Sequence, residues 1–168
     1  MSTFQKLFEF DIKQLMRNTP SVIRSDVAGG FKSGVDHNFR IRAIDIDNTE
    51  NWLVCCGSLD GFERKVYGFL AIFHRPSQSL TSAYVAHETF NSVLFHESFN
   101  AIVTVSNNDA ITFWNRSAMS RLTSSRLSSA MGFAMSLNQS NFHLSVGGSS
   151  SMIDCFVHFN KSYSVCMR

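Results

Sequence analysis

The sequence predicts an all-β fold, and three observations carry this prediction. From residue 40 onward, runs of four to eight β-branched and aromatic residues alternate with clusters of Asn, Gly, Ser and Asp, which is typical of short strands joined by turns. The chain has 168 residues, of which 44% are hydrophobic and 17% charged, so it can bury a core and is not of the disordered class. The strand pattern also recurs along the chain, which indicates a repeated β unit.

Residues 1–36 form an N-terminal arm ahead of the strand-rich part. In residues 4–15 the apolar positions fit one face of a helix and alternate equally well as a strand, so both elements stay open. Asn18-Thr19-Pro20 ends either element, and the glycines of residues 29–34 indicate a flexible loop. Residues 1–42 carry a net charge of +3, for which a solvated, mildly basic arm is the favoured interpretation.

Self-similarity divides the rest of the chain into three copies. Residues 44–57 superpose without a gap on residues 93–106 at an offset of 49, and residues 102–114 superpose on residues 144–156 at an offset of 42. Residues 133–137 supply the first strand of the last unit, one residue out of step. The copies span about 37–86, 87–126 and 127–168. In the middle copy we expect strands at Ser92–Phe95, Ala101–Val105, Ala110–Trp114 and Ala118–Leu122.

The middle copy resembles a repeat of the WD-repeat β-propeller family. In that family a His opens the unit, an Asp holds the turn before the third strand, and that strand ends in Trp-Asp; each unit forms a four-stranded blade. His87 matches the opening His, Asn108 the turn Asp, and Trp114-Asn115 the closing pair. The resemblance implies a structural role for these residues in a hydrogen-bond network that holds the turns of one blade.

The other two copies depart further from the family pattern. In the first copy His37 takes the opening position and Phe73-His74 the closing pair; the third has no opening His and closes with Phe156-Val157. The resemblance therefore implies a partial propeller of about three four-stranded antiparallel blades over residues 37–168, packed mainly through alternating apolar faces. It also implies that Leu7–Ile12 of the arm could supply a ring-closing strand.

Two polar segments lie outside this repeated pattern. Residues 58–68 make the first copy's loop longer than the equivalent turn, so this loop is either a solvated hairpin extension, which we favour, or a binding loop. The Ser-rich residues 117–129 are either a polar outer strand with its loop, which we favour, or a phosphorylated segment. The candidate binding residues are Asp60, Phe62, Arg64, Lys65 and Tyr67.

The motifs of catalysis and cofactor binding are missing from the sequence. It contains no GxSxG, HxH or HExxH spacing and no glycine-rich phosphate-binding fingerprint, so we expect no catalytic residue, no metal site and no cofactor. The cysteines show no CxxC spacing and lie in apolar surroundings, which predicts buried, reduced thiols. They are Cys55, Cys56, Cys155 and Cys166.

The most favoured function is a non-catalytic scaffold that binds proteins or peptides on its loop faces, as a subunit of a larger complex. We expect an intracellular location, in cytoplasm or nucleus, and no membrane span, because the longest apolar runs are far below about 20 residues. Three units are fewer than the roughly four blades that a propeller needs, so we expect the isolated chain to be dimeric, partner-bound or aggregation-prone, with a further chain completing the ring. The alternatives are a small closed barrel that holds an apolar ligand, and an RNA-contacting module using the basic arm, although nucleic acid is not the favoured partner.

Overall fold

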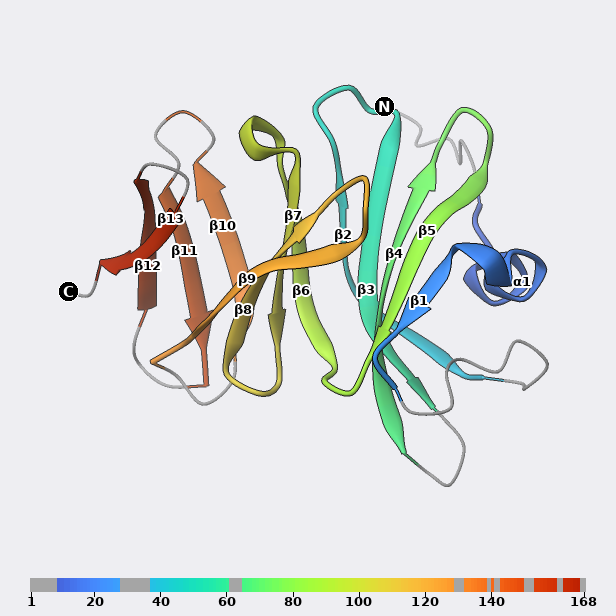
Figure 1. Cartoon of the computed structure of the whole chain (residues 1–168), viewed down its shortest axis with the longest axis horizontal. Helices are drawn as coiled ribbons and strands as arrows, with labels where there is room; N and C mark the ends of the chain where they lie inside the picture. Colours follow the sequence, from blue (N-terminus) through green and yellow to red (C-terminus); the bar gives the residue numbers. More distant parts are fainter. Residues whose placement is uncertain are drawn as a thin grey trace, which may run out of the picture.

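A computed structural model describes residues 9–27, 37–60, 65–128, 132–138, 140, 143–149, 153–159 and 162–166, with side chains as far as Phe156. The described strands form three separate sheets that stand in a row, with helix α1 at one end and the third sheet at the other (Figure 1). The all-β prediction is confirmed. None of these sheets closes on itself, so the alternative of a small closed barrel is wrong for the described strands.

The first sheet has five strands in the order β1-β5-β4-β3-β2. Its last four strands follow one another as an antiparallel meander, whereas β1 adds to β5 in the parallel direction. A bulge at Arg42 interrupts the β2–β3 ladder, and Gly57 lies opposite it, where a Cβ would overlap the carbonyl oxygen of Arg40. The strands are β1 (Ile23–Ser25), β2 (Phe39–Ile46), β3 (Trp52–Asp60), β4 (Val66–His74) and β5 (Ser79–Ala86).

The second and third sheets are four-stranded antiparallel meanders. In the second sheet a short 3-10 turn, η3 (Glu97–Phe99), joins the first two strands. The strands of the second sheet are β6 (Phe90–His96), β7 (Ala101–Ser106), β8 (Ala110–Asn115) and β9 (Ser120–Arg126). Those of the third are β10 (Gly132–Asn138), β11 (His143–Gly148), β12 (Ile153–Phe159) and β13 (Ser162–Cys166).

Apolar layers between the sheets hold the row together. Because side chains alternate along a strand, each sheet can present a separate apolar set on each face. Val54 and Cys56 of the first sheet pack on Val93, Phe95 and the other residues of the second sheet's near face. The far face of the second sheet packs on the third sheet, through Val103, Val105, Ile111, Phe113, Leu144, Val146 and Phe156.

The outer face of the third sheet has a different character from the equivalent face of the second. Alternation places Ser136, Ser145 and Gly147 on this face, since their neighbours Leu144 and Val146 point toward the second sheet. At the offset of 42 residues, these three positions correspond to the apolar residues Leu94, Val103 and Val105 of the second sheet. Ile153 of β12 is 66% exposed on the same face, so the described part of this face mixes polar, small and apolar side chains.

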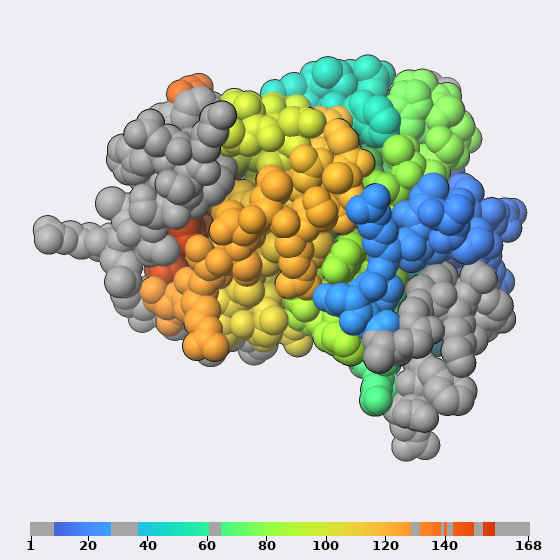
Figure 2. Space-filling view, viewed as in Figure 1, coloured from blue at the N-terminus to red at the C-terminus, as the bar shows by residue number. Residues whose placement is uncertain are grey.

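The N-terminal segment (residues 9–27) covers the opposite end of the row. It contains α1 (Ile12–Asn18), the 3-10 turn η1 (Pro20–Val22) and β1. Asp11 caps the helix by accepting from the backbone N–H of Gln14, and Pro20 stands at the start of η1. Ile12, Met16 and Val27 are buried against the outer face of the first sheet, and Figure 2 shows the blue segment lying over the green strands.

Two local expectations differ from the structure. The ring-closing strand predicted at Leu7–Ile12 is not formed by its described residues, because residues 9–11 are not strand and Ile12 begins α1. Residues 7 and 8 lie outside the described residues. The arm instead adds β1 to the first sheet. The strand expected at Ala118–Leu122 begins later, because Asn115 accepts from the N–H of Ala118 and Met119 has a φ of 47°, which holds a turn. Residues 117–129 do supply the outer strand β9, as favoured.

The cap formed by the N-terminal segment gives a first prediction. Replacing the fully buried Met16 by Ala is expected to lower the free energy of unfolding by about 2 kcal/mol or more, because it leaves a cavity between α1 and the first sheet. Gln14→Ala, at an exposed position of the same helix, is the matched control and should stay within about 0.5 kcal/mol of the wild type. Urea unfolding measures both. Equal stabilities of the two variants would show that α1 does not contribute to the core.

Candidate functional site

A shallow groove runs along β2, β6 and β10, the strands with which the antiparallel meanders of the three sheets begin. β2 packs against β6, and β6 packs against β10, although these strands belong to different sheets. The groove has a volume of about 430 Å³. Its lining combines apolar side chains with two carboxylates and comprises Ala43, Ile44, Asp45, Ile46, Asn48, Ser92, Val93, Leu94, Phe95, Glu97, Met135, Ser136 and Leu137.

Side chains bridge the open edges of these first strands. Phe95 donates its backbone N–H to Asp45 Oδ2 at 2.7 Å, so a carboxylate from β2 satisfies an edge donor of β6. Asn91 Nδ2 donates to the carbonyl oxygen of Gly132 at 2.9 Å, and the Arg42 guanidinium donates to Asn91 Oδ1. Hydrogen bonds from side chains therefore cross from sheet to sheet beside the groove.

Asp45 makes the stability of this groove depend on pH. Burial raises the pKa of Asp45 above its ordinary value of 3.8 and the nearby charge of Asp47 adds to the rise, although the backbone N–H groups of Phe95 and Ile46 oppose it. A carboxyl whose pKa is raised by folding binds its proton more tightly in the folded state. Its contribution to stability is therefore present at low pH and lost as the pH rises through the folded-state pKa.

Asp45→Asn removes this penalty and keeps an acceptor for the Phe95 N–H. We expect the variant to equal or exceed the wild type in its urea midpoint at about pH 7, and to lose that advantage at about pH 3, where the wild-type carboxyl is protonated. Unfolding curves at the two pH values provide the measurement. If the variant were less stable than the wild type by the same amount at both pH values, burial of the Asp45 carboxylate would not be the cause of the difference.

An exposed apolar strip lies on β2, on the face turned away from the second sheet. Its members, which we call the isoleucine strip, are Ile41, Ile44 and Ile46, with exposed fractions of 55%, 60% and 42%. Register places Ile44 beside Cys55 and Ile46 beside Leu53, the residues that α1 and its neighbours cover. The N-terminal segment thus covers the centre of this face, and the strip at its edge stays open to solvent.

The corresponding positions of the second sheet are covered by a neighbouring sheet, whereas the isoleucine strip is not. At the offset of 49 residues, Ile44 corresponds to Val93 and Ile46 to Phe95 of the second sheet. Val93 and Phe95 are only 4% and 3% exposed, because the first sheet packs on them. Contiguous exposed apolar side chains rimmed by polar ones mark interaction surfaces.

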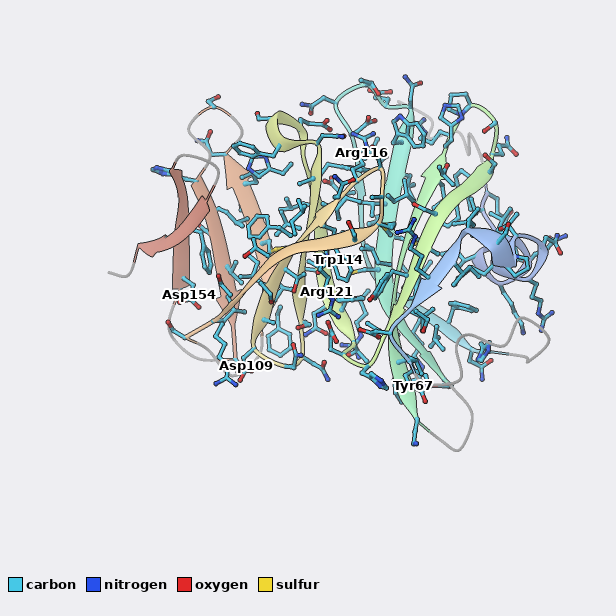
Figure 3. The ribbon with its side chains drawn as sticks, in the orientation of Figure 1. Tyr67, Asp109, Trp114, Arg116, Arg121 and Asp154 are labelled. Carbon is cyan, nitrogen blue, oxygen red and sulfur yellow. The ribbon has the colours of Figure 1, made fainter. Side chains whose placement is uncertain are left out.

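Arg116 is the centre of a charge cluster that joins the first two sheets (Figure 3). Its guanidinium lies 2.9 Å from Asp47 Oδ2 and 3.4 Å from Glu97 Oε2. The same group lies over the rings of Trp52 and Phe95, at 5.4 and 4.6 Å from their centroids. Burial alone would raise the pKa of Asp47, but Arg116 and the donors from Trp52 and Thr49 outweigh it and hold the pKa below 3.8.

Arg121 forms a second link, between β9 and the N-terminal segment. It donates to Glu88 Oε1 at 2.6 Å and to Asp26 Oδ2 at 3.1 Å. Its guanidinium also lies 5.0 Å above the Trp114 ring and 6.0 Å from that of Tyr84. Figure 3 places Arg121 and Trp114 together where the first two sheets meet. This contact fixes the end of β1 to the second sheet.

The residues of the predicted repeat motif lie in different environments. Trp114 is fully buried in β8 and donates its indole N–H to Thr104 Oγ1 at 2.8 Å. His87 is exposed, with its ring 6.0 Å from that of Tyr67, and Asn108 is exposed in the turn, where its Oδ1 accepts from Ser106. Asn115 ends β8 and holds the next turn. The structure therefore does not bring His87 and Asn108 to Trp114.

Two of the first copy's motif residues, His37 and Phe73, are structural as well. His37 is buried, its Nδ1 lies 2.9 Å from the carbonyl oxygen of Asp60, and its ring packs edge-on to Phe39. Phe73 is fully buried, with its ring centroid 5.1 Å from that of Phe10 in the N-terminal segment. Both residues hold the first sheet and its cover in place.

The buried Trp–Thr pair of the second sheet has an apolar counterpart in each of the others. Trp114 faces Ile102 in the ladder, Phe73 faces Leu53, and Phe156 faces Leu144, so the three aromatic residues occupy equivalent positions. The position of Thr104 is taken by Cys55 in the first sheet and by Val146 in the third. Donor and acceptor are thus lost together, which leaves no indole or hydroxyl group unpaired at these sites.

The predicted binding loop is described only in part. Phe62 and Arg64 lie outside the described residues. Asp60 lies at the end of β3, 3.7 Å from the Arg40 guanidinium, Lys65 is exposed, and Tyr67 packs partly on the first sheet's outer core. The structure does not gather the described three into a pocket, and β3 and β4, at nine residues each, take up most of the extra length as hairpin.

The buried thiols of β3 are chemically quiet. Burial raises the pKa of Cys55 far above its ordinary range, and the neighbouring Cys56 adds to the rise. Burial also raises the pKa of Cys56 to about 12. Within the described residues, no three His, Cys, Asp or Glu side chains are grouped so that they could hold a metal ion. In the same part of the chain, α1 and every other helix are too short or too polar to cross a membrane.

Comparison with known proteins adds no identification. No protein-family model matches the chain, and a comparison with curated proteins finds no match.

Sequence reasoning missed the most telling residues of this region, namely the isoleucine strip, Asp47 and Arg116. The repeat offset could have found the strip, since Ile44 and Ile46 align with Val93 and Phe95 of the next copy. The Asp47–Arg116 pair joins residues 69 positions apart, and no local pattern marks it.

Proposed function

We infer that the chain is a non-catalytic scaffold of the open-propeller type, which binds a partner protein through the uncovered part of its first sheet. The partner supplies a β-sheet or strand that packs on the isoleucine strip, as the first sheet packs on Val93 and Phe95. The chain would then be one subunit of a larger complex.

One observation carries this proposal: Ile44 and Ile46 are 60% and 42% exposed, while their repeat counterparts are 4% and 3% exposed. In the third copy the equivalent residues, Met135 and Leu137, are partly buried against the second sheet, so the first copy exposes this position most. Since burying apolar surface contributes about 25 cal/mol per Å², covering three exposed isoleucines favours association. The groove beside the strip adds two carboxylates, Asp45 and Glu97, that could orient a partner.

The third sheet of a second copy is a poor candidate for this partner. Its outer face carries Ser136, Ser145 and Gly147 where the second sheet has apolar side chains, and among its described side chains Ile153 is the large apolar group exposed there, so it offers less apolar surface to the strip than the second sheet offers to the first. The N-terminal segment also covers the middle of the first sheet's outer face. The partner is therefore a different protein with an apolar strand or sheet face.

Site-specific photo-cross-linking in cells tests the proposal. A photoreactive residue at Ile44 is expected to cross-link to one partner protein, and the same residue at Leu122 is the matched control, because Leu122 is 56% exposed on β9 of the second sheet. The double variant Ile44→Ser/Ile46→Ser should remove the complex from size-exclusion profiles of cell extract while leaving urea unfolding within about 1 kcal/mol of the wild type, since both positions are largely exposed.

The opposite results are equally clear. Equal cross-linking at Ile44 and Leu122, or a complex that survives the double variant, would reject the strip as the interface. Light scattering on the purified chain tests whether the partner is a second copy of the chain. A wild-type dimer that becomes monomeric in the double variant would identify a second copy as the partner and overturn the choice of a different protein.

A further inference from the structure

Two cysteines of the third sheet stand directly opposite each other. In the antiparallel ladder between β12 and β13, Cys155 is the register partner of Cys166. Directly opposed residues in such a ladder have Cα atoms about 4.5 or 5.5 Å apart, and both values lie within the 4.4–6.8 Å that a disulfide spans. The backbone therefore already meets the main geometric requirement for a disulfide.

The position of Cys155 gives it access to an oxidant. Its neighbours Asp154 and Phe156 are buried toward the second sheet, so alternation places Cys155 on the outer face of the third sheet. Ile153, which lies on the same face, is 66% exposed. Cys155 is half-buried, and its Sγ lies 3.7 Å from Ser145 Oγ, its partner across the ladder on the β11 side. The directly opposed side chains of Ser145 and Cys155 are thus in contact on this face.

The other two cysteines contrast with this pair. Cys55 and Cys56 are neighbours in β3, point to opposite faces of the first sheet, and are both fully enclosed by core residues. Their burial keeps small oxidants away from them. Oxidation is therefore expected to be selective for the third sheet.

We propose that Cys155 and Cys166 form a reversible cross-strand disulfide that locks β13 onto β12. The oxidant is a low-molecular-weight disulfide such as oxidised glutathione. One cysteine thiolate attacks it, forms a mixed disulfide and releases one glutathione thiol; the second cysteine then displaces the other glutathione thiol as the protein S–S bond forms. Two protein thiols lose two protons and two electrons, and one glutathione disulfide becomes two thiols.

Mass spectrometry of the full chain tests this proposal. Lys161 is the only tryptic site between the two cysteines, so trypsin separates them onto residues 127–161 and 162–168. After equilibration in oxidised glutathione and blocking of the remaining thiols under denaturing conditions, we expect these two peptides to be joined by a disulfide, with Cys55 and Cys56 recovered as blocked thiols. Reduction should release the two peptides.

A second measurement separates a lock from a chance oxidation. Amide hydrogen exchange in residues 162–166 is expected to slow at least tenfold on oxidation of the wild type, and not in Cys155→Ser or Cys166→Ser. Both variants should instead carry one glutathione in mixed disulfide. Wild-type chain that keeps all four thiols, or that accumulates glutathione on Cys155 without joining the two peptides, would overturn the proposal, as would linkage that leaves exchange in β13 unchanged.

Discussion

Replacing Trp114 by Ala is expected to lower the free energy of unfolding by about 3–5 kcal/mol. The indole is fully buried between the first two sheets and packs on the rings of Tyr84 and Phe90, at centroid distances of 4.9 and 5.8 Å. It also donates to Thr104 and lies under the Arg121 guanidinium. Because Ala leaves a cavity at the junction of two sheets, urea unfolding should show the loss directly.

A double-mutant cycle isolates the hydrogen bond of this site from its packing. Thr104→Val leaves the indole N–H buried without its acceptor and is expected to cost about 1–3 kcal/mol. Trp114→Phe removes the donor and some volume, and the double variant reproduces the apolar pairing that the other two sheets already contain. We expect the double variant to be more stable than the sum of the single losses predicts, by about 0.5 kcal/mol or more. Additive losses would show that the bond contributes nothing specific.

Replacing Arg116 by Met is the second change with a large expected effect, a loss of about 3 kcal/mol or more. Arg116 is 15% exposed and is the cation between Asp47 and Glu97, so its removal leaves the Asp47 carboxylate buried without its counter-charge. Arg121→Met is the matched control, since Arg121 also bridges two carboxylates and covers an aromatic ring but is 37% exposed. We expect that control to cost about 1 kcal/mol or less.

The effect of Arg116→Met should also depend on pH. In the wild type the pKa of Asp47 is held below 3.8, so its contribution to stability is present above that value and is lost as the pH falls through the folded-state pKa. Without Arg116, only the donors from Trp52 and Thr49 oppose the effect of burial on Asp47, so its pKa is expected to be higher than in the wild type. The difference between wild type and variant is therefore expected to be largest near about pH 7 and to shrink toward about pH 3 in urea unfolding. A difference independent of pH would point to lost packing over Trp52 and Phe95 instead.

Much of the strand pattern could be predicted from periodicity. The strands expected in the middle copy overlap β6, β7, β8 and β9, and the offset of 49 residues aligns β2 and β3 with β6 and β7. Strand formation is local enough to be read this way, because each β residue needs alternating apolar positions and turn residues at the ends. The secondary structure of the N-terminal segment could not be predicted in this way, since its apolar positions fit both the helical and the strand period. Only its packing on the first sheet selects the helix.

The candidate site was less accessible to sequence reasoning. Trp114 was identified, but its partner is Thr104 across the ladder, whereas His87 and Asn108 remain at the surface. The contacts that hold the groove, such as that of Asp45 with Phe95, join residues about 50 positions apart. They follow from the way β2 lies beside β6, which no window of the sequence contains.

The sequence by itself determined that this protein is built from short strands in three similar units, because alternation and turn chemistry act over a few residues. Tertiary structure alone decided which repeated positions are buried. Val93 and Phe95 are covered by the first sheet, and Ile44 and Ile46 are not, since the N-terminal segment reaches only part of their sheet. Burial depends on what packs against a strand, and that neighbour comes from a distant part of the chain or from another protein.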